Sequence, residues 1–336
     1  MKPFLVRHES EIWYIIEKLD DGRRRKISTK TRDRHEAEQQ LLRYVPASVS
    51  TEASCAPFLT QFIQEFHDHM SYSLAPTTVR LYTDAFASFL EIVGNVPVDL
   101  VSARDIDRYV AMRVKRIKPI TVNKELSTLK AAFNHAVRWG YIEKNPFVGI
   151  RKLRVPEKMP VYFTRDEVRT LIDGTTADWL RDIIIVAVAT GMRMGEMLAL
   201  TWPHVDLTNR VVKIVNTESF RTKTGKYRVV PLNGDAKAVL DRRRQMREKV
   251  VFTQAGLRIK QDWLTHAFKK TIRRLGMRDE LHFHALRHTF ASWLVQDGVS
   301  LYQVGRLLGH ADTKTTEIYA HLQPETMHDI VDRLNL

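Results

Sequence analysis

The chain has 336 residues, 44% of them apolar, with a formal net charge of +14 and a single cysteine, Cys55. One cysteine excludes an internal disulfide and every zinc site built from several cysteines. A chain of this length usually forms two or three domains, each with its own core. The longest apolar run, residues 183–189, is far below the ~20 residues of a membrane helix, so we expect a cytoplasmic protein with no membrane partner.

The positive charge is concentrated in one part of the chain. Residues 201–275 contain 18 Lys and Arg against 6 Asp and Glu, a net charge of +12 on fewer than a quarter of the residues. Such a concentration is typical of proteins that bind nucleic acid, although a basic face that only keeps a protein soluble has the same composition. Composition therefore favours a nucleic-acid partner without identifying one.

Residues 1–45 predict a small module of two strands and a helix. Residues alternate in EIWYIIEKL, Asp21 and Gly22 favour a turn, and RRRKIST is strand-like. Such a ribbon fits the DNA major groove, so the module could bind DNA. Four basic residues would lie on the second strand: Arg23, Arg24, Arg25 and Lys26. The alternative is that these residues only form a solvated basic surface on the hairpin.

Residues 46–56 are a predicted linker, small and polar with a proline near each end, and residues 57–148 are a predicted domain of four helices. In the first helix, aromatic residues and Met70 recur every four residues from Phe58 onward. Ser102 and Thr121 are predicted N-caps of two later helices. Four basic residues on those two helices could bind a phosphate backbone, or they could only form a solvated face: Lys115, Arg116, Lys124 and Lys130.

A second linker is predicted at residues 149–160, and residues 161–336 are a predicted third domain, mainly helical with a small sheet and a C-terminal tail helix. Thr164 to Glu167 form a capping box that begins its first helix. RVVKIV and KYRVVPL predict two strands. The fold class is therefore multidomain, mainly α with small β-sheets.

Three clusters in the last domain differ from ordinary packing patterns. In ATGMRMGEMLAL, Gly191 ends an apolar helix and Arg193 begins the next, with a buried stem and a guanidinium predicted to be free for bidentate phosphate binding. The alternative is an ordinary helix pair between Arg193 and Glu196, worth a few tenths of a kcal/mol.

The second cluster is HFHALRHTFASWL, where His284, Arg287 and His288 share one helix face. Histidines four residues apart also suggest a metal site. The arginine between them is a poor neighbour for a dication, so the pattern favours a phosphate pocket and no metal. For His288 alone, a partly buried histidine with its hydrogen bonds satisfied is the simpler interpretation.

The third cluster is LLGHADTKTTEIYAHL. His310 follows Gly309, and Tyr319 comes nine residues later on a short predicted helix that Thr313 can cap. Considered without the other clusters, Tyr319 is best interpreted as a packing residue, as most tyrosines in helices are. Together the three clusters supply arginines, histidines and a phenol. A phenol of pKa near 10 needs a base or nearby cations to act as a nucleophile, and paired guanidiniums stabilise the charge of a five-coordinate phosphate without a metal.

TGMRMGE, RTKTGK, HALRHTFASWL, LLGH and TEIYAHL occur in the order and at the rough spacing found in tyrosine recombinases, the integrase family of phages and mobile elements. The chain resembles this family over residues 57–322. The resemblance implies that residues 57–148 are a core-binding domain, that residues 161–336 are the catalytic domain, and that residues 1–45 are an arm-type DNA-binding module. The resemblance implies that Tyr319 is the nucleophile and that Arg193 and Arg287 bind the phosphate. His284 would assist deprotonation and His310 would complete the pocket. Glu196 and His288 would be supporting residues.

The resemblance also implies a leaving-group acid, Lys223, which would protonate the 5′ oxygen while Tyr319 forms a 3′-phosphotyrosyl link. Lys226 in the same hairpin is the alternative. The retained bond energy would allow rejoining without ATP, metal or other cofactor. The expected partners are double-stranded DNA attachment sites, a homotetramer on DNA, and accessory DNA-bending or excision factors.

Several alternatives stay open. Within the family, a Xer-like or transposon-type resolvase would usually begin at the core-binding helices, whereas an integrase carries an additional module such as residues 1–45. From other classes, the chain could be a non-catalytic DNA-binding regulator or a type IB topoisomerase. In the tail, Met327, Ile330, Val331 and Leu334 form an apolar stripe that could pack on a neighbouring subunit or on its own domain.

Overall fold

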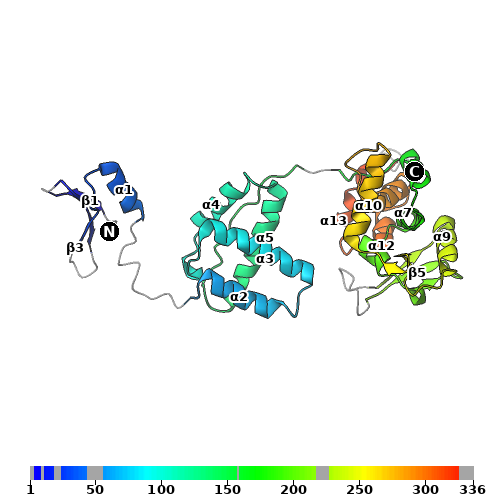
Figure 1. The fold of residues 1–336 in the computed structure, drawn as a ribbon, viewed down its shortest axis with the longest axis horizontal. Helices are drawn as coiled ribbons and strands as arrows, with labels where there is room; N and C mark the ends of the chain where they lie inside the picture. The colour runs from blue at the N-terminus through cyan, green and yellow to red at the C-terminus, as the bar shows by residue number, and fades with distance from the viewer. Residues whose placement is uncertain are drawn as a thin grey trace, which may run out of the picture. The chain divides into compact units, whose positions relative to one another are not determined.

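A computed structural model describes residues 4–8, 11–18, 24–43, 56–156, 159–216 and 227–324 of the chain (Figure 1). The chain divides into two compact units after Pro156, which lies inside the linker predicted at 149–160. The finer division into three modules stays a prediction. Several predicted features lie outside the described residues: Cys55, Arg23, Lys223, Lys226 and the tail stripe at 327–334.

The N-terminal module is a three-stranded antiparallel sheet with one helix (Figure 1). The predicted hairpin is present as β2 (Trp13–Lys18) and β3 (Arg24–Ser28), with Ile15 opposite Ile27. An additional strand, β1 (Phe4–Arg7), pairs with β2, so the module has one strand more than the sequence predicted. The sequence of β1, FLVR, has three successive apolar residues and does not alternate, so a period of two does not identify it. Helix α1 (Arg34–Arg43) follows.

The helical domain consists of α2 (Leu59–Met70), α3 (Pro76–Val93), η2 (Val98–Leu100), α4 (Ala103–Arg113) and α5 (Pro119–Arg138). Phe62 and Phe66 are fully buried, and Phe62 contacts Phe86 and Phe133 at ring-centroid distances of 6.1 and 5.7 Å. Phe58 does not continue this stripe, because it occupies the N-cap of α2 and is 51% exposed.

Of the two N-caps predicted in this domain, one is confirmed and one is wrong. Ser102 caps α4 in a complete capping box with Asp105. Thr121 does not cap α5, because Pro119 already begins that helix and Lys118 is its N-cap. Proline fixes φ near the helical value and lacks an N–H that the first turn cannot use, so it favours the start of a helix.

The last unit begins with α6 (Arg165–Gly174), capped by Thr164 and Glu167 as predicted, and α7 (Asp178–Thr190), which contributes Ile183, Ile184 and Ala187 to the core. Next come α8 (Met194–Leu198) and η3 (Trp202–His204). The predicted strands are β5 (Val211–Ile214) and β6 (Arg228–Pro231), and β4 (Val205–Asp206) adds a third.

The remaining elements of this unit are mostly helical, as predicted. They are α9 (Gly234–Arg244), α10 (Gln261–Arg274), α11 (Ala285–Gln296), α12 (Leu301–Leu308), α13 (Lys314–Glu317) and η4 (Ala320–Leu322). A short hairpin, β7 (Thr253–Gln254) with β8 (Leu257–Arg258), was not predicted. Thr313 occupies the N-cap of α13, but its side chain makes no capping hydrogen bond. Among the described residues, no helix has the length and apolar character to span a membrane.

Gly191 sets the direction of the chain between α7 and α8. Its φ of 62° is left-handed, and a Cβ at this position would lie 2.5 Å from a ring carbon of Phe290 and 2.9 Å from a methyl carbon of Leu308. Only glycine meets both demands, because a side chain would clash with two core residues and strain the backbone. The turn places Arg193 directly at the start of α8.

We therefore expect Gly191→Ala to destabilise the protein by more than about 1 kcal/mol, because the left-handed backbone alone costs about that much for an L-residue. Thermal unfolding would measure the change. Gly234→Ala is the matched control, since a Cβ at the start of α9 meets nothing within 4 Å and φ there is not left-handed. Equal stability of the Gly191→Ala and Gly234→Ala proteins would contradict this account of the turn.

Candidate active site

Arg287 lies at the centre of the polar residues that the sequence singled out. It belongs to α11 and is 4% exposed. Its Nη1 donates to the carbonyl of Gly191 at 2.6 Å, and its Nη2 donates to the carbonyl of Leu308 at 2.8 Å. Through this one side chain, α11 is joined to the C-terminal ends of α7 and α12.

Burial and the neighbouring Arg193 lower the pKa of Arg287 to about 9. The guanidinium therefore stays charged at neutral pH, held in place by two backbone carbonyls rather than by a carboxylate. Because these carbonyls are neutral, the positive charge of Arg287 is available to attract an incoming anion. This is the property expected of a phosphate-binding arginine.

The sequence predicted a free guanidinium at Arg193, and this prediction is wrong. Arg193 is paired with the carboxylate of Glu196. Its backbone N–H and its Nη1 donate to Glu196 at 2.8 and 3.0 Å. The Glu196 side chain is only 2% exposed, so this is not the weak surface pair considered as the alternative. The Arg193 side chain is itself partly exposed.

Arg228, on β6, is a component of the site that the sequence did not reveal. It binds Glu196 with both terminal nitrogens, at 2.8 and 2.6 Å, and its side chain is 12% exposed. Its Nε is buried without a hydrogen-bond partner. Gly309 permits this arrangement, because a Cβ there would lie 2.6 Å from Cδ of Arg228. An arginine at the start of a strand carries no pattern that would mark it as functional.

Glu196 is the buried acid that balances these two arginines. Burial acts to raise its pKa, but Arg228 and then Arg193 outweigh burial, so the pKa is lowered overall. Glu196 is therefore ionised at neutral pH. Because Arg228 holds both carboxylate oxygens, Arg193 needs only one of its nitrogens for the pair, which leaves donors for a ligand.

The three histidines of the cluster are neutral at neutral pH. Desolvation, followed by Arg287, lowers the pKa of His310 to about 4, and desolvation, followed by His284, lowers that of His288 to about 4. The pKa of His284 is lowered as well by desolvation and Arg287, although His284 lies at the exposed start of α11. Burial, aided by the surrounding positive charge, thus leaves each imidazole ring neutral, with a lone pair on its unprotonated nitrogen.

The histidines occupy distinct places around the arginines. The rings of His284 and His288 are perpendicular, with centroids 5.1 Å apart. His310 follows α12, and its Nδ1 lies 2.8 Å from the hydroxyl of Thr316 in α13. This bond fixes the segment that leads to Tyr319.

Tyr319 lies between α13 and η4 and is 2% exposed. It packs with Ala291, Val295, Val304 and Leu308, so it is a core residue as well as a member of the polar cluster. Its hydroxyl oxygen lies 2.6 Å from Nδ1 of His288, whereas the resemblance assigned His284 to this tyrosine. Burial raises the pKa of Tyr319 to about 12, with Arg287 opposing that rise.

The predicted DNA-binding residues that the structure describes are all exposed. Arg24, Arg25 and Lys26 lie along β3, with the Lys26 ammonium 4.4 Å from the ring centroid of Tyr14. Lys124 and Lys130 lie on α5 and Lys115 follows α4. Arg116 is paired with Glu91 at 2.5 Å, which reduces its value as a phosphate ligand.

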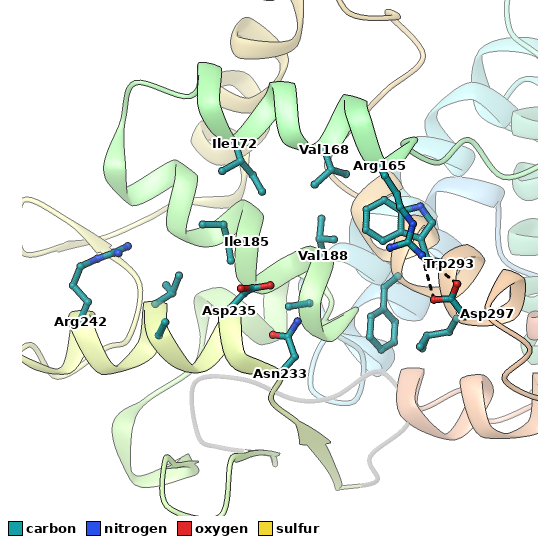
Figure 2. A pocket seen from close by; sticks show the side chains of 15 residues that line it. Arg165, Val168, Ile172, Ile185, Val188, Asn233, Asp235, Arg242, Trp293 and Asp297 are labelled. Atoms are coloured by element: carbon teal, nitrogen blue, oxygen red, sulfur yellow. Dashed lines mark hydrogen bonds and ion pairs between the residues drawn. The ribbon is translucent and has the colours of Figure 1, made fainter.

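Two cavities of the last unit differ in their relation to this cluster. A cavity of about 630 Å³ is lined by Tyr227, Arg228, Arg306, Gly309 and His310, so it borders the polar residues. A larger cavity of about 760 Å³ lies between α6, α7, α9 and α11. Figure 2 shows its mostly apolar lining, which includes Ile185 and Val188, and the ion pair of Arg165 with Asp297 at one side. None of the clustered histidines or Tyr319 lines the larger cavity.

Within the described residues, no group of three or more His, Cys, Asp or Glu is arranged to hold a metal ion. The polar cluster consists instead of three arginines, three histidines, one glutamate and one tyrosine. Such a set can bind a phosphate and accept or donate protons.

Two family models match the chain. The model described as "Phage integrase family" matches residues 162–326, and the model "Phage integrase, N-terminal domain" matches residues 58–154. Among curated proteins, tyrosine recombinase XerC of Lactobacillus leichmannii is 30% identical over 283 residues, which cover 78% of this chain and 93% of that protein. XerC of Alcanivorax borkumensis is 27% identical over 290 residues, with 81% and 92% covered.

Solved structures share the fold. A lambda integrase dimer bound to a COC′ core site superposes with a TM-score of 0.71 at 17% identity, covering 96% of this chain and 95% of that one. The Tn1549 transposon integrase in complex with a circular intermediate DNA also gives 0.71, at 20% identity, and covers 83% of this chain and 100% of that one.

The charge balance at Glu196 gives a test that is independent of any reaction. We expect Arg228→Ala to cost about 3–5 kcal/mol of stability, because it removes the main partner of a buried carboxylate. Adding Glu196→Gln should recover most of that loss, since a neutral amide needs no counter-charge. Urea unfolding of the single and double variants measures both effects.

Arg306→Ala is the control, because Arg306 lines the same cavity but is exposed. Its stability should stay within about 0.5 kcal/mol of the unmodified protein. If Glu196→Gln did not relieve the Arg228→Ala defect, then Arg228 would stabilise the protein through packing rather than through charge.

Proposed function

Because the chain belongs to the phage integrase family of tyrosine recombinases, a family of site-specific recombinases, we propose that Tyr319 is its nucleophile and that Arg193, Arg287, His284 and His310 form the phosphate pocket. The observation that carries this proposal is the contact of Tyr319 with the polar cluster. Its hydroxyl lies 2.6 Å from Nδ1 of His288, and the neighbouring Arg287 on α11 is buried. A core tyrosine needs no such surroundings.

The proposed reaction is an exchange of phosphodiester bonds. The Tyr319 oxygen attacks the scissile phosphorus, a 3′-phosphotyrosyl bond forms, and the bond to the 5′ oxygen breaks. Lys223, or Lys226 in the same segment, protonates the departing oxygen. A 5′-hydroxyl of another strand then reverses the attack, so that strands are rejoined without ATP.

The arginines supply the electrostatic part of catalysis. A five-coordinate phosphate concentrates negative charge on its non-bridging oxygens, and fixed donors stabilise that charge more than they stabilise the ground state. Arg287 is fixed by two carbonyls, and Arg193 is fixed by Glu196, which Arg228 neutralises in turn. With these cations in place, the proposed chemistry needs no metal ion.

The proposed partners are double-stranded attachment sites and three further copies of the chain. Two duplexes are exchanged through four cleavages, one by each subunit. The related lambda integrase has been seen as a tetramer bound to a Holliday junction. Exposed basic residues of the helical domain, Lys115, Lys124 and Lys130, are the proposed contacts to the DNA backbone.

Among recombinases, we propose an integrase of a phage or mobile element rather than a Xer-like resolvase. The family models begin at residue 58, and the XerC relative covers 78% of the chain. The module of β1 to β3 and α1 precedes that point, and the lambda integrase fold covers 96% of the chain. This module supports binding to a second class of DNA site.

The first test is covalent capture. A duplex that binds the protein can be selected from a randomised pool with the Tyr319→Phe variant, and nicks are then placed one nucleotide apart across it. We expect the unmodified protein to form a denaturation-resistant adduct on one such nicked duplex and Tyr319→Phe to form none. Arg193→Ala should bind the duplex but cleave about 10²-fold more slowly or worse, because it lacks one transition-state donor.

An adduct with Tyr319→Phe would refute the assignment of the nucleophile. Equal losses of binding and cleavage in Arg193→Ala would instead make Arg193 a binding residue. His266→Leu provides a control for surface changes, since His266 is an exposed residue of α10. Its adduct yield should equal that of the unmodified protein.

The second test concerns the N-terminal module. Reversing two exposed charges with Arg24→Glu and Arg25→Glu should abolish protection of DNA outside the cleavage site, because those side chains would repel phosphates. Cleavage of an isolated core duplex should stay within about twofold. Footprinting on DNA from the region that flanks the gene measures the first effect. Protection confined to the core site in the unmodified protein would argue for a resolvase.

A further inference from the structure

The hydroxyl of Tyr319 has a partner that the integrase resemblance did not assign to it. Its oxygen lies 2.6 Å from Nδ1 of His288, and the two rings are 5.9 Å apart at an angle of 52°. His288 is on α11, immediately after Arg287 and one turn after His284. Among the hydrogen bonds of the described residues, none joins His284 to Tyr319.

The direction of this hydrogen bond follows from the charges around it. His288 faces His284 and His282 of its own segment, and also Arg287 and His310. Desolvation and these groups lower its pKa to about 4, so the ring is neutral at pH 7 and Nδ1 can offer a lone pair. The phenol, with its pKa raised to about 12, keeps its proton and donates it to that nitrogen.

Loss of the proton to solvent is an inefficient route to the reactive form of Tyr319. With a pKa of about 12, only about one Tyr319 in 10⁵ would be ionised at pH 7. Arg287 favours the phenolate but does not outweigh burial. A neighbouring group must therefore take the proton as the oxygen attacks.

On the premise of the function proposed above, we propose that His288 is this proton acceptor and that it holds the Tyr319 hydroxyl in position for attack. His288 contacts the reacting atom itself, which makes it a catalytic residue rather than the supporting or satisfied histidine that the sequence suggested. His284, at the exposed start of α11, is left to contact the phosphate.

The proton and electron balance of the step is complete without another reactant. The O–H bond of Tyr319 breaks, and its proton moves to Nδ1 of His288. The phenolic oxygen forms the bond to phosphorus, and the bond from phosphorus to the 5′ oxygen breaks. That oxygen takes a proton from the proposed lysine acid, and the reverse reaction returns the first proton from His288 to Tyr319.

The same arrangement links activation of the nucleophile to arrival of DNA. In the free protein, Arg287 and the other histidines disfavour a positive charge on His288. A phosphodiester bound at Arg287 brings a negative charge that offsets this effect and raises the proton affinity of His288. The phenol therefore becomes a nucleophile only when a phosphate occupies the pocket.

The experiment uses the full-length protein and the nicked duplex found by covalent capture, with the 5′ oxygen at the cleaved position replaced by sulfur. Sulfur leaves without an acid, so cleavage of this duplex reports the nucleophile rather than the lysine. The informative variant is His288→Asn, whose amide oxygen can still accept the Tyr319 hydrogen bond but cannot take up a proton. Single-turnover adduct formation is measured from pH 6 to 9.

We expect the adduct-forming rate of the unmodified protein to change with pH much less than tenfold per unit, because His288 rather than solvent takes the proton of Tyr319. His288→Asn should be slower at pH 7 by about 10²-fold or more, the usual contribution of a general base. Its rate should rise tenfold for each pH unit, since Tyr319 must then lose its proton to solvent. Lys223→Ala should recover on the sulfur duplex, whereas His288→Asn should not.

Controls separate this role from folding. His288→Asn should bind uncut duplex and unfold thermally like the unmodified protein, and His266→Leu should cleave normally. A His288→Asn rate within twofold of the unmodified rate would overturn the inference. It would also fall if His284→Asn, rather than His288→Asn, showed the tenfold slope. If the unmodified protein formed no adduct on any nicked duplex, the proposed function and this inference would both be wrong.

Discussion

The buried guanidinium of Arg287 is the interaction on which the site depends. Three segments far apart in the sequence meet at it, because its nitrogens bind the carbonyls of Gly191 and Leu308 from within α11. Those carbonyls belong to helix ends, where no intrahelical donor is available for them. A charged donor therefore satisfies the ends of α7 and α12 and is itself held still. The pocket is assembled by the same bonds that hold the unit together, so its geometry does not have to be created when a ligand binds.

The electrostatic state of the cluster follows from an excess of cations over acids. Arg193, Arg228 and Arg287 lie near a single carboxylate, that of Glu196. Burial, aided by this positive charge, keeps the nearby histidines neutral, and Arg287 opposes the burial that raises the pKa of Tyr319. A neutral imidazole and a protonated phenol are the correct starting states for a base and a nucleophile. An anionic phosphate would complete the charge balance.

The larger elements were predictable because their patterns are long. The helical stripe of Phe62 and Phe66, the capping boxes at Ser102 and Thr164, and the β5 and β6 strands all arise from local rules. The strands β7 and β8 were missed because two residues carry no usable period, and β1 was missed because its sequence FLVR does not alternate between apolar and polar residues. Thr121 was misplaced as a cap because the more local preference of Pro119 for a first turn prevailed. At the site, the boxes containing Arg193, His284, Arg287, His310 and Tyr319 were visible in order, since each is a short motif.

The sequence by itself determined which kinds of side chain are present and that Tyr319 had to be interpreted together with distant arginines and histidines. Only the tertiary structure decided how they pair. Arg228 joins Glu196 because β6 passes beside α8, and Gly309 leaves room for its guanidinium. The hydroxyl of Tyr319 meets His288 instead of His284, because the packing of Tyr319 against Val295 and Leu308 fixes where its ring points. Spacing along a helix places both histidines on one face, but the choice between them depends on contacts made by residues about thirty positions away.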